Sequence, residues 1–146
     1  GGLELNGYVT DSCGSPAGTG SPSAGLTSPD GRFVTFASDA TDTGFTNPPT
    51  THGPAGVNCG LGFARQVYVR DRATGALELV SRAPGGGAAG DRESTSAGLS
   101  ANGEWVVFQT RARNLIDGTV TDDGGGSQGR TKVMLHHRAT GLNERA

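Results

Sequence analysis

An internal repeat constrains the fold of this chain more than any other feature of its sequence. The segment Ser23–Phe36 recurs as Ser96–Phe108, and the segment Val67–Gly75 recurs as Val133–Gly141. The first pair begins 73 residues apart and the second 66 apart, so the connection between the matched segments is shorter in the second copy. The chain therefore holds two copies of one supersecondary unit.

Each copy is predicted to form four antiparallel strands. Asp30-Gly31 and Asn102-Gly103 follow the first strand, and these residue pairs tolerate the positive φ of a tight hairpin turn. An Ala-Thr-Gly turn precedes the last strand of both copies. The predicted strands are Ser23–Thr27, Arg32–Ser38, Gln66–Asp71 and Ala76–Ser81, then Ser96–Ser100, Glu104–Thr110, Lys132–His137 and Leu142–Ala146.

The second strand of each copy is apolar on both of its faces. Side chains alternate along a strand, so Trp105 and Val107 oppose Val106 and Phe108. We expect both faces of each sheet to be buried, with Trp105 in the core or against a neighbouring blade. A repeated antiparallel sheet covered on both faces favours the radially packed blades of a β-propeller over a sandwich.

The segments Ser28–Thr41 and Gln66–Gly75 resemble the WD40-like repeat of bacterial TolB-type β-propellers, and the resemblance extends over most of residues 21–146. It implies an all-β fold with two four-stranded antiparallel blades, residues 21–82 and 94–146, in a single unit spanning residues 1–146. It implies little about activity, because such propellers support many functions.

Two blades cannot close a propeller, which needs at least four. We therefore expect closure by oligomerisation, or as part of a longer chain. Leu3–Leu5 resembles Leu77–Leu79, so residues 1–10 are predicted to be the last strand of a preceding or partner blade. A strand supplied from another chain would cover an open sheet edge.

Cys13 and Cys59, the only cysteines, lie in connections that emerge on the same face of the predicted blades. We predict a disulfide between them, which favours an oxidising compartment and an extracellular or periplasmic location. The connections of residues 39–65 and 111–131 are long and show no strand pattern. Loops of this length are commonly functional, so a binding site is expected on this long-loop face.

Three side chains of the first long connection form a candidate ligand-contact loop: Phe45, His52 and Phe63. Phe45 and Phe63 suit stacking against a sugar. The alternative is that both aromatic side chains hold the loop down on the domain.

Calcium is the one cofactor to weigh, because carboxylates of the long connections offer oxygen ligands. These are Asp39, Asp42, Asp117, Asp122 and Asp123. The family pattern has an Asp just before the third strand, whereas this chain has Arg65-Gln66 and Thr131-Lys132. We therefore expect no cofactor. His136 and His137 are adjacent on one strand, so they point to opposite faces and are expected to pack or lie on the surface rather than share a metal.

The sequence contains no complete catalytic constellation, and we expect no enzyme activity. A net charge of -2 without a basic run argues against nucleic-acid binding, and no apolar run reaches the length of a membrane span. We expect a secreted, non-catalytic propeller module that acts as a structural or protein-interaction unit, self-assembling through blade completion between chains. The alternatives are a glycan- or ligand-binding propeller that uses the long-loop face, and a fragment of a larger enzyme-associated propeller.

Replacing Cys13 with Ser tests the predicted disulfide. A bridge from Cys13 to Cys59 closes a loop of about 46 residues, so its loss is expected to lower the free energy of unfolding by about 3–4 kcal/mol. Urea denaturation of the oxidised parent and variant measures the difference. Reductant should abolish the difference in unfolding free energy between parent and variant. If proteolysis under non-reducing conditions releases no peptide pair joined through Cys13 and Cys59, the predicted pairing is contradicted.

Overall fold

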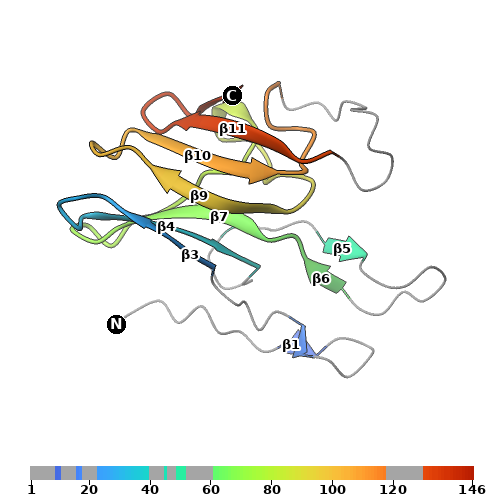
Figure 1. Ribbon diagram of the computed structural model, residues 1–146. Coiled ribbons are helices and arrows are strands. Elements are labelled where there is room, and N and C mark those ends of the chain that lie inside the picture. Colours follow the sequence, from blue (N-terminus) through green and yellow to red (C-terminus); the bar gives the residue numbers. More distant parts are fainter. Residues whose placement is uncertain are drawn as a thin grey trace.

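The computed structural model describes residues 9–10, 16–17, 23–39, 45, 49–51, 61–117 and 130–146 (Figure 1). Its main elements are two four-stranded antiparallel sheets, which confirm the predicted all-β class. The first sheet has the order β3 (Ser23–Thr27), β4 (Phe33–Ser38), β7 (Gln66–Asp71) and β8 (Leu77–Leu79). The second has the order β9 (Ser94–Leu99), β10 (Trp105–Thr110), β11 (Lys132–His137) and β12 (Leu142–Arg145).

The same turn connects the first two strands of both sheets. The Phe33 amide donates to Ser28 Oγ and the Trp105 amide donates to Ser100 Oγ, both at 2.9 Å. Gly31 and Gly103 close these turns with φ of 71° and 73°, which only glycine adopts without strain. Ser100 is therefore the counterpart of Ser28 and belongs to the turn, so the first strand of the second copy ends at Leu99.

A bulge in β3 explains why its sequence contains glycine. The register of β3 against β4 shifts between Ala24 and Thr27. A Cβ on Gly25 would overlap the carbonyl oxygen of Thr35 on β4. The buried Thr35 hydroxyl lies 2.9 Å from the Leu26 amide and 3.1 Å from its carbonyl oxygen, so it satisfies both backbone groups that the bulge takes out of the ladder.

The two sheets pack face to face, and β9 lies against β3, β4 and β7 (Figure 1). The first sheet contributes the side chains of β4 and β7 that point toward the second sheet, and the second sheet contributes those of β10 and β11. The buried cluster between them is Ala37, Val67, Val69, Val80, Val106, Phe108, Ala112, Leu115 and Met134. Burial of such a cluster is the main stabilising term of a domain of this size.

The opposite face of the first sheet is covered at its long-loop end. Tyr68 is fully buried there, with its ring 5.5 Å from Phe36 and 6.1 Å from Phe45. Leu79 and Ala89 complete this second cluster. The expectation that both faces are buried therefore holds for the long-loop end of the first sheet, whereas Val34, Arg70 and Leu77 at the turn end are only partly buried.

That expectation is wrong for the second sheet. Burial alternates along β10, because Val106, Phe108 and Thr110 face the first sheet while the intervening side chains are exposed. Trp105 lies on the exposed side and not in the core. The reason is position, because among the described residues only one face of the second sheet has a partner sheet.

The connections contain short strands that the sequence did not predict. The expected patternless segment of residues 39–65 includes the hairpin of β5 (Pro49–Thr51) and β6 (Leu61–Phe63). The predicted linker that follows residues 1–10 includes β2 (Pro16–Ala17), which pairs with β1 (Val9–Thr10). Strands of two or three residues are too short to show an alternating pattern.

A short 3₁₀ helix, η1 (Pro84–Gly86), lies in the connection between the sheets. The rest of the predicted N-terminal strand lies outside the described residues. Within the part of the chain that the structure describes, no helix is long and apolar enough to span a membrane.

The close approach of β3 to β4 predicts unequal effects at Gly25 and Gly98, which match in the sequence repeat but lie at different positions relative to the bulge that each strand contains. Gly25→Ala is expected to lower the free energy of unfolding by about 3 kcal/mol or more, because the new methyl group meets a backbone carbonyl that cannot move cheaply. In Gly98→Ala the methyl group meets only the end of the exposed Val107 side chain, at 2.8 Å, so a loss of about 1 kcal/mol is expected. Urea denaturation of both variants decides the order, and equal losses would contradict the close approach of Gly25 to the Thr35 backbone.

Candidate functional site

The exposed side of the second sheet, here termed the Trp105 face, carries five apolar side chains together with the polar Gln109, His137 and Glu144. The apolar side chains come from β10, β11 and β12: Trp105, Val107, Val133, Leu135 and Leu142. Trp105 is 37% exposed, Val107 39%, Val133 42% and Leu142 56%. Exposed aromatic and aliphatic side chains of this kind, gathered on one flat sheet, are typical of interaction surfaces.

The repeat relates the Trp105 face to a surface that is already buried. Trp105 corresponds to Phe33, Val133 to Val67 and Glu144 to Glu78. In the first sheet these positions face the second sheet, where they form the contact described above. The contact between the two sheets therefore shows what kind of surface packs against a face with the composition of the Trp105 face.

Phe33 occupies a defined position in that contact. Its ring lies against Gly103, where an added Cβ would come within 2.5 Å of a ring carbon. The guanidinium carbon of Arg138 lies 4.4 Å from the ring centroid, and Arg138 Nη1 donates to the Gly103 carbonyl oxygen at 2.7 Å. The guanidinium carbon of Arg32 also lies over the ring, 4.7 Å from its centroid, so Phe33 contacts a glycine and two cations, which its ring quadrupole attracts.

Glu78 supplies the charge that complements Arg138. Arg138 Nε donates to Glu78 Oε2 at 2.8 Å, and His136 Nε2 lies 3.4 Å from Glu78 Oε1. Burial by itself raises the pKa of Glu78, but hydrogen bonds from His136 and Arg138 outweigh it, so the pKa lies below its ordinary value of 4.5. His136 is itself held by Asn143, whose Oδ1 lies 2.8 Å from His136 Nδ1.

A second ion pair fixes the turn end of the first sheet. Arg32 donates to both carboxylate oxygens of Asp71, at 3.2 and 2.9 Å. The hydrogen bond from Arg32 holds the pKa of Asp71 well below its usual range. The second copy has Glu104 and His137 at these positions, and the His137 ring instead lies 4.5 Å from that of Trp105.

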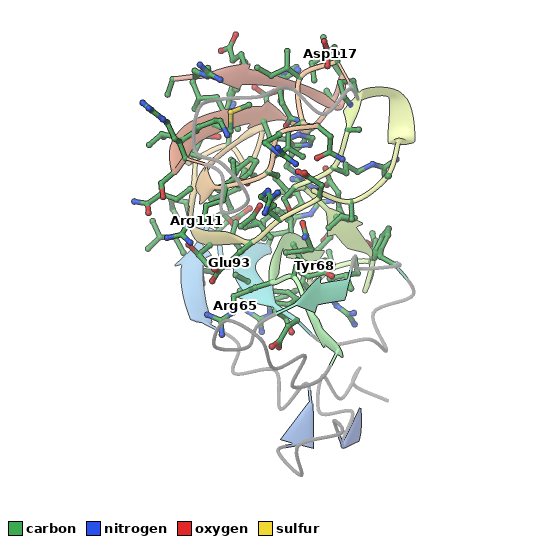
Figure 2. The ribbon with its side chains drawn as sticks, turned by 90° about the vertical axis from the view of Figure 1, so that its right-hand side faces the viewer. Arg65, Tyr68, Glu93, Arg111 and Asp117 are labelled. Atoms are coloured by element: carbon green, nitrogen blue, oxygen red, sulfur yellow. The ribbon has the colours of Figure 1, made fainter. Side chains whose placement is uncertain are left out.

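The long-loop end of the sheets presents charged and polar groups. Figure 2 shows Arg111, Glu93 and Arg65 in succession along this end, where the Arg111 amide donates to the Glu93 carbonyl oxygen at 2.9 Å. A cleft of about 220 Å³ opens beside them, lined by Glu93, Thr95, Gln109, Thr110, Arg111 and Thr131. It offers hydrogen-bonding groups but no aromatic side chain.

The predicted ligand-contact loop is described only in part. Phe45 packs on Tyr68 within the second buried cluster, and Phe63 belongs to β6, opposite Pro49. His52 lies outside the described residues, as do Cys13 and Cys59. The predicted disulfide and the loop's ligand role therefore stay predictions.

The two histidines of β11 point to opposite faces, as predicted. His136 is buried between the sheets and His137 lies beside Trp105. No group of three or more metal-ligating side chains gathers among the residues described here. Asp42, Asp122 and Asp123 are not among them, so calcium binding by these carboxylates is untested.

Comparisons with protein-family models, curated protein sequences and solved structures found no match to this chain. The repeat and the contact between the sheets are therefore the features of this chain that bear on its function. The sequence alone identifies Gly103 only as a turn residue and does not single out Glu78 or Arg138 as site residues. The signal was present, because Glu78 and Glu144 lie 66 residues apart, as do Arg72 and Arg138, in the alignment that reveals the repeat.

Glu78→Gln tests the charged contact between the sheets. The free energy of unfolding at neutral pH is expected to fall by about 1–2 kcal/mol, because a partly buried charge-assisted hydrogen bond is lost. The folded-state pKa of Glu78 is lowered, so its contribution is complete above pH 4.5 and is lost as the pH falls through the folded-state pKa. The difference in unfolding free energy between parent and variant should therefore shrink as the pH falls through the folded-state pKa of Glu78.

Glu144→Gln is the matched control, because Glu144 occupies the equivalent position on the exposed face. At low protein concentration it is expected to change the free energy of unfolding by less than about 0.5 kcal/mol. Urea denaturation at several pH values measures both variants. If Glu78→Gln and Glu144→Gln lower the free energy of unfolding equally, Glu78 acts only through its own strand and not through Arg138.

Proposed function

We propose that the chain is a non-catalytic β-propeller module of the TolB-type, WD40-like kind, which acts as a structural or protein-interaction unit. The observation that carries this proposal is the relation between two equivalent faces. The face of the first sheet that contains Phe33 is buried by a second sheet, while the Trp105 face of the second sheet has the same pattern and is exposed.

The direction of packing supports a blade interpretation. The Phe33 side of the first sheet packs on the side of the second sheet that contains Phe108, and this side corresponds by the repeat to the Phe36 side of the first sheet. Unlike faces therefore meet. A stack built this way has a direction, and each added sheet presents again the face to which the next one binds.

The proposed role follows from the two end faces. The Trp105 face gathers the exposed side chains of Trp105, Val107, Val133 and Leu142 on one side of the sheet, and it suits a further sheet as partner. We propose that such sheets come from other chains, so that assembly completes the propeller. The proposed extracellular or periplasmic location rests on the predicted Cys13–Cys59 disulfide.

Binding of a glycan or another polar ligand at the long-loop end is the second candidate. The polar cleft beside Glu93 and Arg111 favours it, since its side chains offer both donors and acceptors. The packing of Phe45 on Tyr68 gives this candidate less support, because that ring is engaged within the chain. Binding of a sugar that is abolished by Arg111→Ala, with the Trp105 face unchanged, would favour it.

A tandem of two copies joined by a flexible Gly/Ser linker tests the proposed module. Tethering gives an effective concentration of about millimolar, so a blade-type face should dock even if free chains bind weakly. Trp105 is the only tryptophan of the chain, so its fluorescence reports on this face. In the tandem one of the two Trp105 side chains is expected to become shielded from a soluble quencher.

The control is the same tandem with Val34→Glu and Leu77→Glu in both copies, on the partly exposed side of each first sheet. Both tryptophans should then remain accessible. A parent tandem in which both Trp105 side chains are as accessible as in the single chain would contradict the proposed packing role.

A further inference from the structure

The contact between the two sheets defines which surface would receive the Trp105 face. Phe33 lies on Gly103 beneath Arg138, and Glu78 binds Arg138 and approaches His136. The residues of the first sheet that correspond to Gly103, Arg138 and His136 are Gly31, Arg72 and Arg70. The first sheet thus carries its own copy of the receiving surface.

This receiving surface, termed the Arg70 face, lies at the turn end of the first sheet, on the side away from the second sheet. The register of the strands places Val34, Arg70 and Leu77 side by side on it. Gly31 and Arg72 lie at its turn end. All five residues are at least partly exposed, whereas Tyr68, nearer the long loops, is covered.

The local geometry of the receiving surface is already formed. Arg72 Nη1 donates to the Gly31 carbonyl oxygen at 3.0 Å, which matches the bond of 2.7 Å between Arg138 and Gly103. At Gly103 the space above the glycine is filled by the Phe33 ring. At Gly31 an added Cβ would meet only Arg72 Nη1, at 3.6 Å, among the described atoms. An aromatic ring can therefore enter where Phe33 enters in the other copy.

Charge makes the two faces complementary. Glu144 on the Trp105 face is exposed and forms no ion pair with the residues that the structure describes. Arg70 and Arg72 likewise have no carboxylate partner within the described ranges. One face therefore offers a carboxylate and the other offers two guanidinium groups. This matches the contact between the sheets, where Glu78 binds Arg138.

We propose that the Trp105 face of one copy docks on the Arg70 face of a second copy, head to tail, with Trp105 on Gly31 beneath Arg72 and Glu144 paired with Arg70 and Arg72. The proposal rests on the proposed module function and names its partner. Because the two faces differ, the interface is heterologous, and repetition closes a ring or extends a filament.

A charge swap tests the pairing in the free 146-residue chain. Glu144→Arg alone and the double variant Arg70→Glu/Arg72→Glu alone are each expected to weaken self-association at least about tenfold, because like charges then meet. The triple variant that combines them restores opposite charges and should recover association. This recovery also shows that the component variants still fold.

Light scattering after size exclusion measures association, and the wavelength of Trp105 emission against protein concentration reports its burial. Arg145→Glu is the control, because Arg145 is adjacent to Glu144 on β12 and points to the other side of the sheet. It should leave association unchanged.

Three other outcomes of these association measurements would each overturn part of the proposal. A parent chain that stays monomeric with Trp105 accessible at all concentrations overturns the second-copy proposal, and if the tandem still docks, the module function survives. Loss of association in Glu144→Arg but not in Arg70→Glu/Arg72→Glu would mean that two Trp105 faces pack on each other, which overturns the head-to-tail arrangement. Failure of the triple variant to recover overturns the pairing of Glu144 with the two arginines.

Discussion

Packing of the first sheet on the second is the contact on which the rest of the structure depends. Each sheet alone would expose one strongly apolar face, and joining them buries the aliphatic cluster around Val69, Phe108 and Met134. Polar groups then fix how the sheets meet, because Arg138 binds both Glu78 and the turn at Gly103. Apolar burial holds the sheets together, and the charged contact determines their register.

The same contact explains why the molecule has two chemically different ends. Unlike faces meet at the centre, so unlike faces remain outside: the Trp105 face on the second sheet and the Arg70 face on the first. A head-to-head arrangement would have left two similar ends. The functional meaning of the structure therefore lies in the direction of the repeat as much as in any single residue.

The sequence was sufficient for the strands and turns of the two four-stranded sheets, and insufficient for the short strands of the connections and for the candidate site. The positions of β7 and β11 follow directly from the match of Val67–Gly75 with Val133–Gly141, because strand alternation and glycine turns are local properties. The exposure of Trp105 does not follow from the repeat, because Phe33 in the equivalent position is half-buried. Two similar sequences receive different environments because one sheet has a neighbour on that side.

By itself the sequence determined the all-β class, the two meanders and their strand order, since the repeat and the backbone demands of Gly31 and Gly103 suffice for these. Only the tertiary structure decided which faces meet, that Arg138 binds Glu78 across the sheets, and that Trp105 stays outside. These features depend on contacts between segments about 60 residues apart in the sequence. The alternation of side chains along a single strand does not encode such contacts.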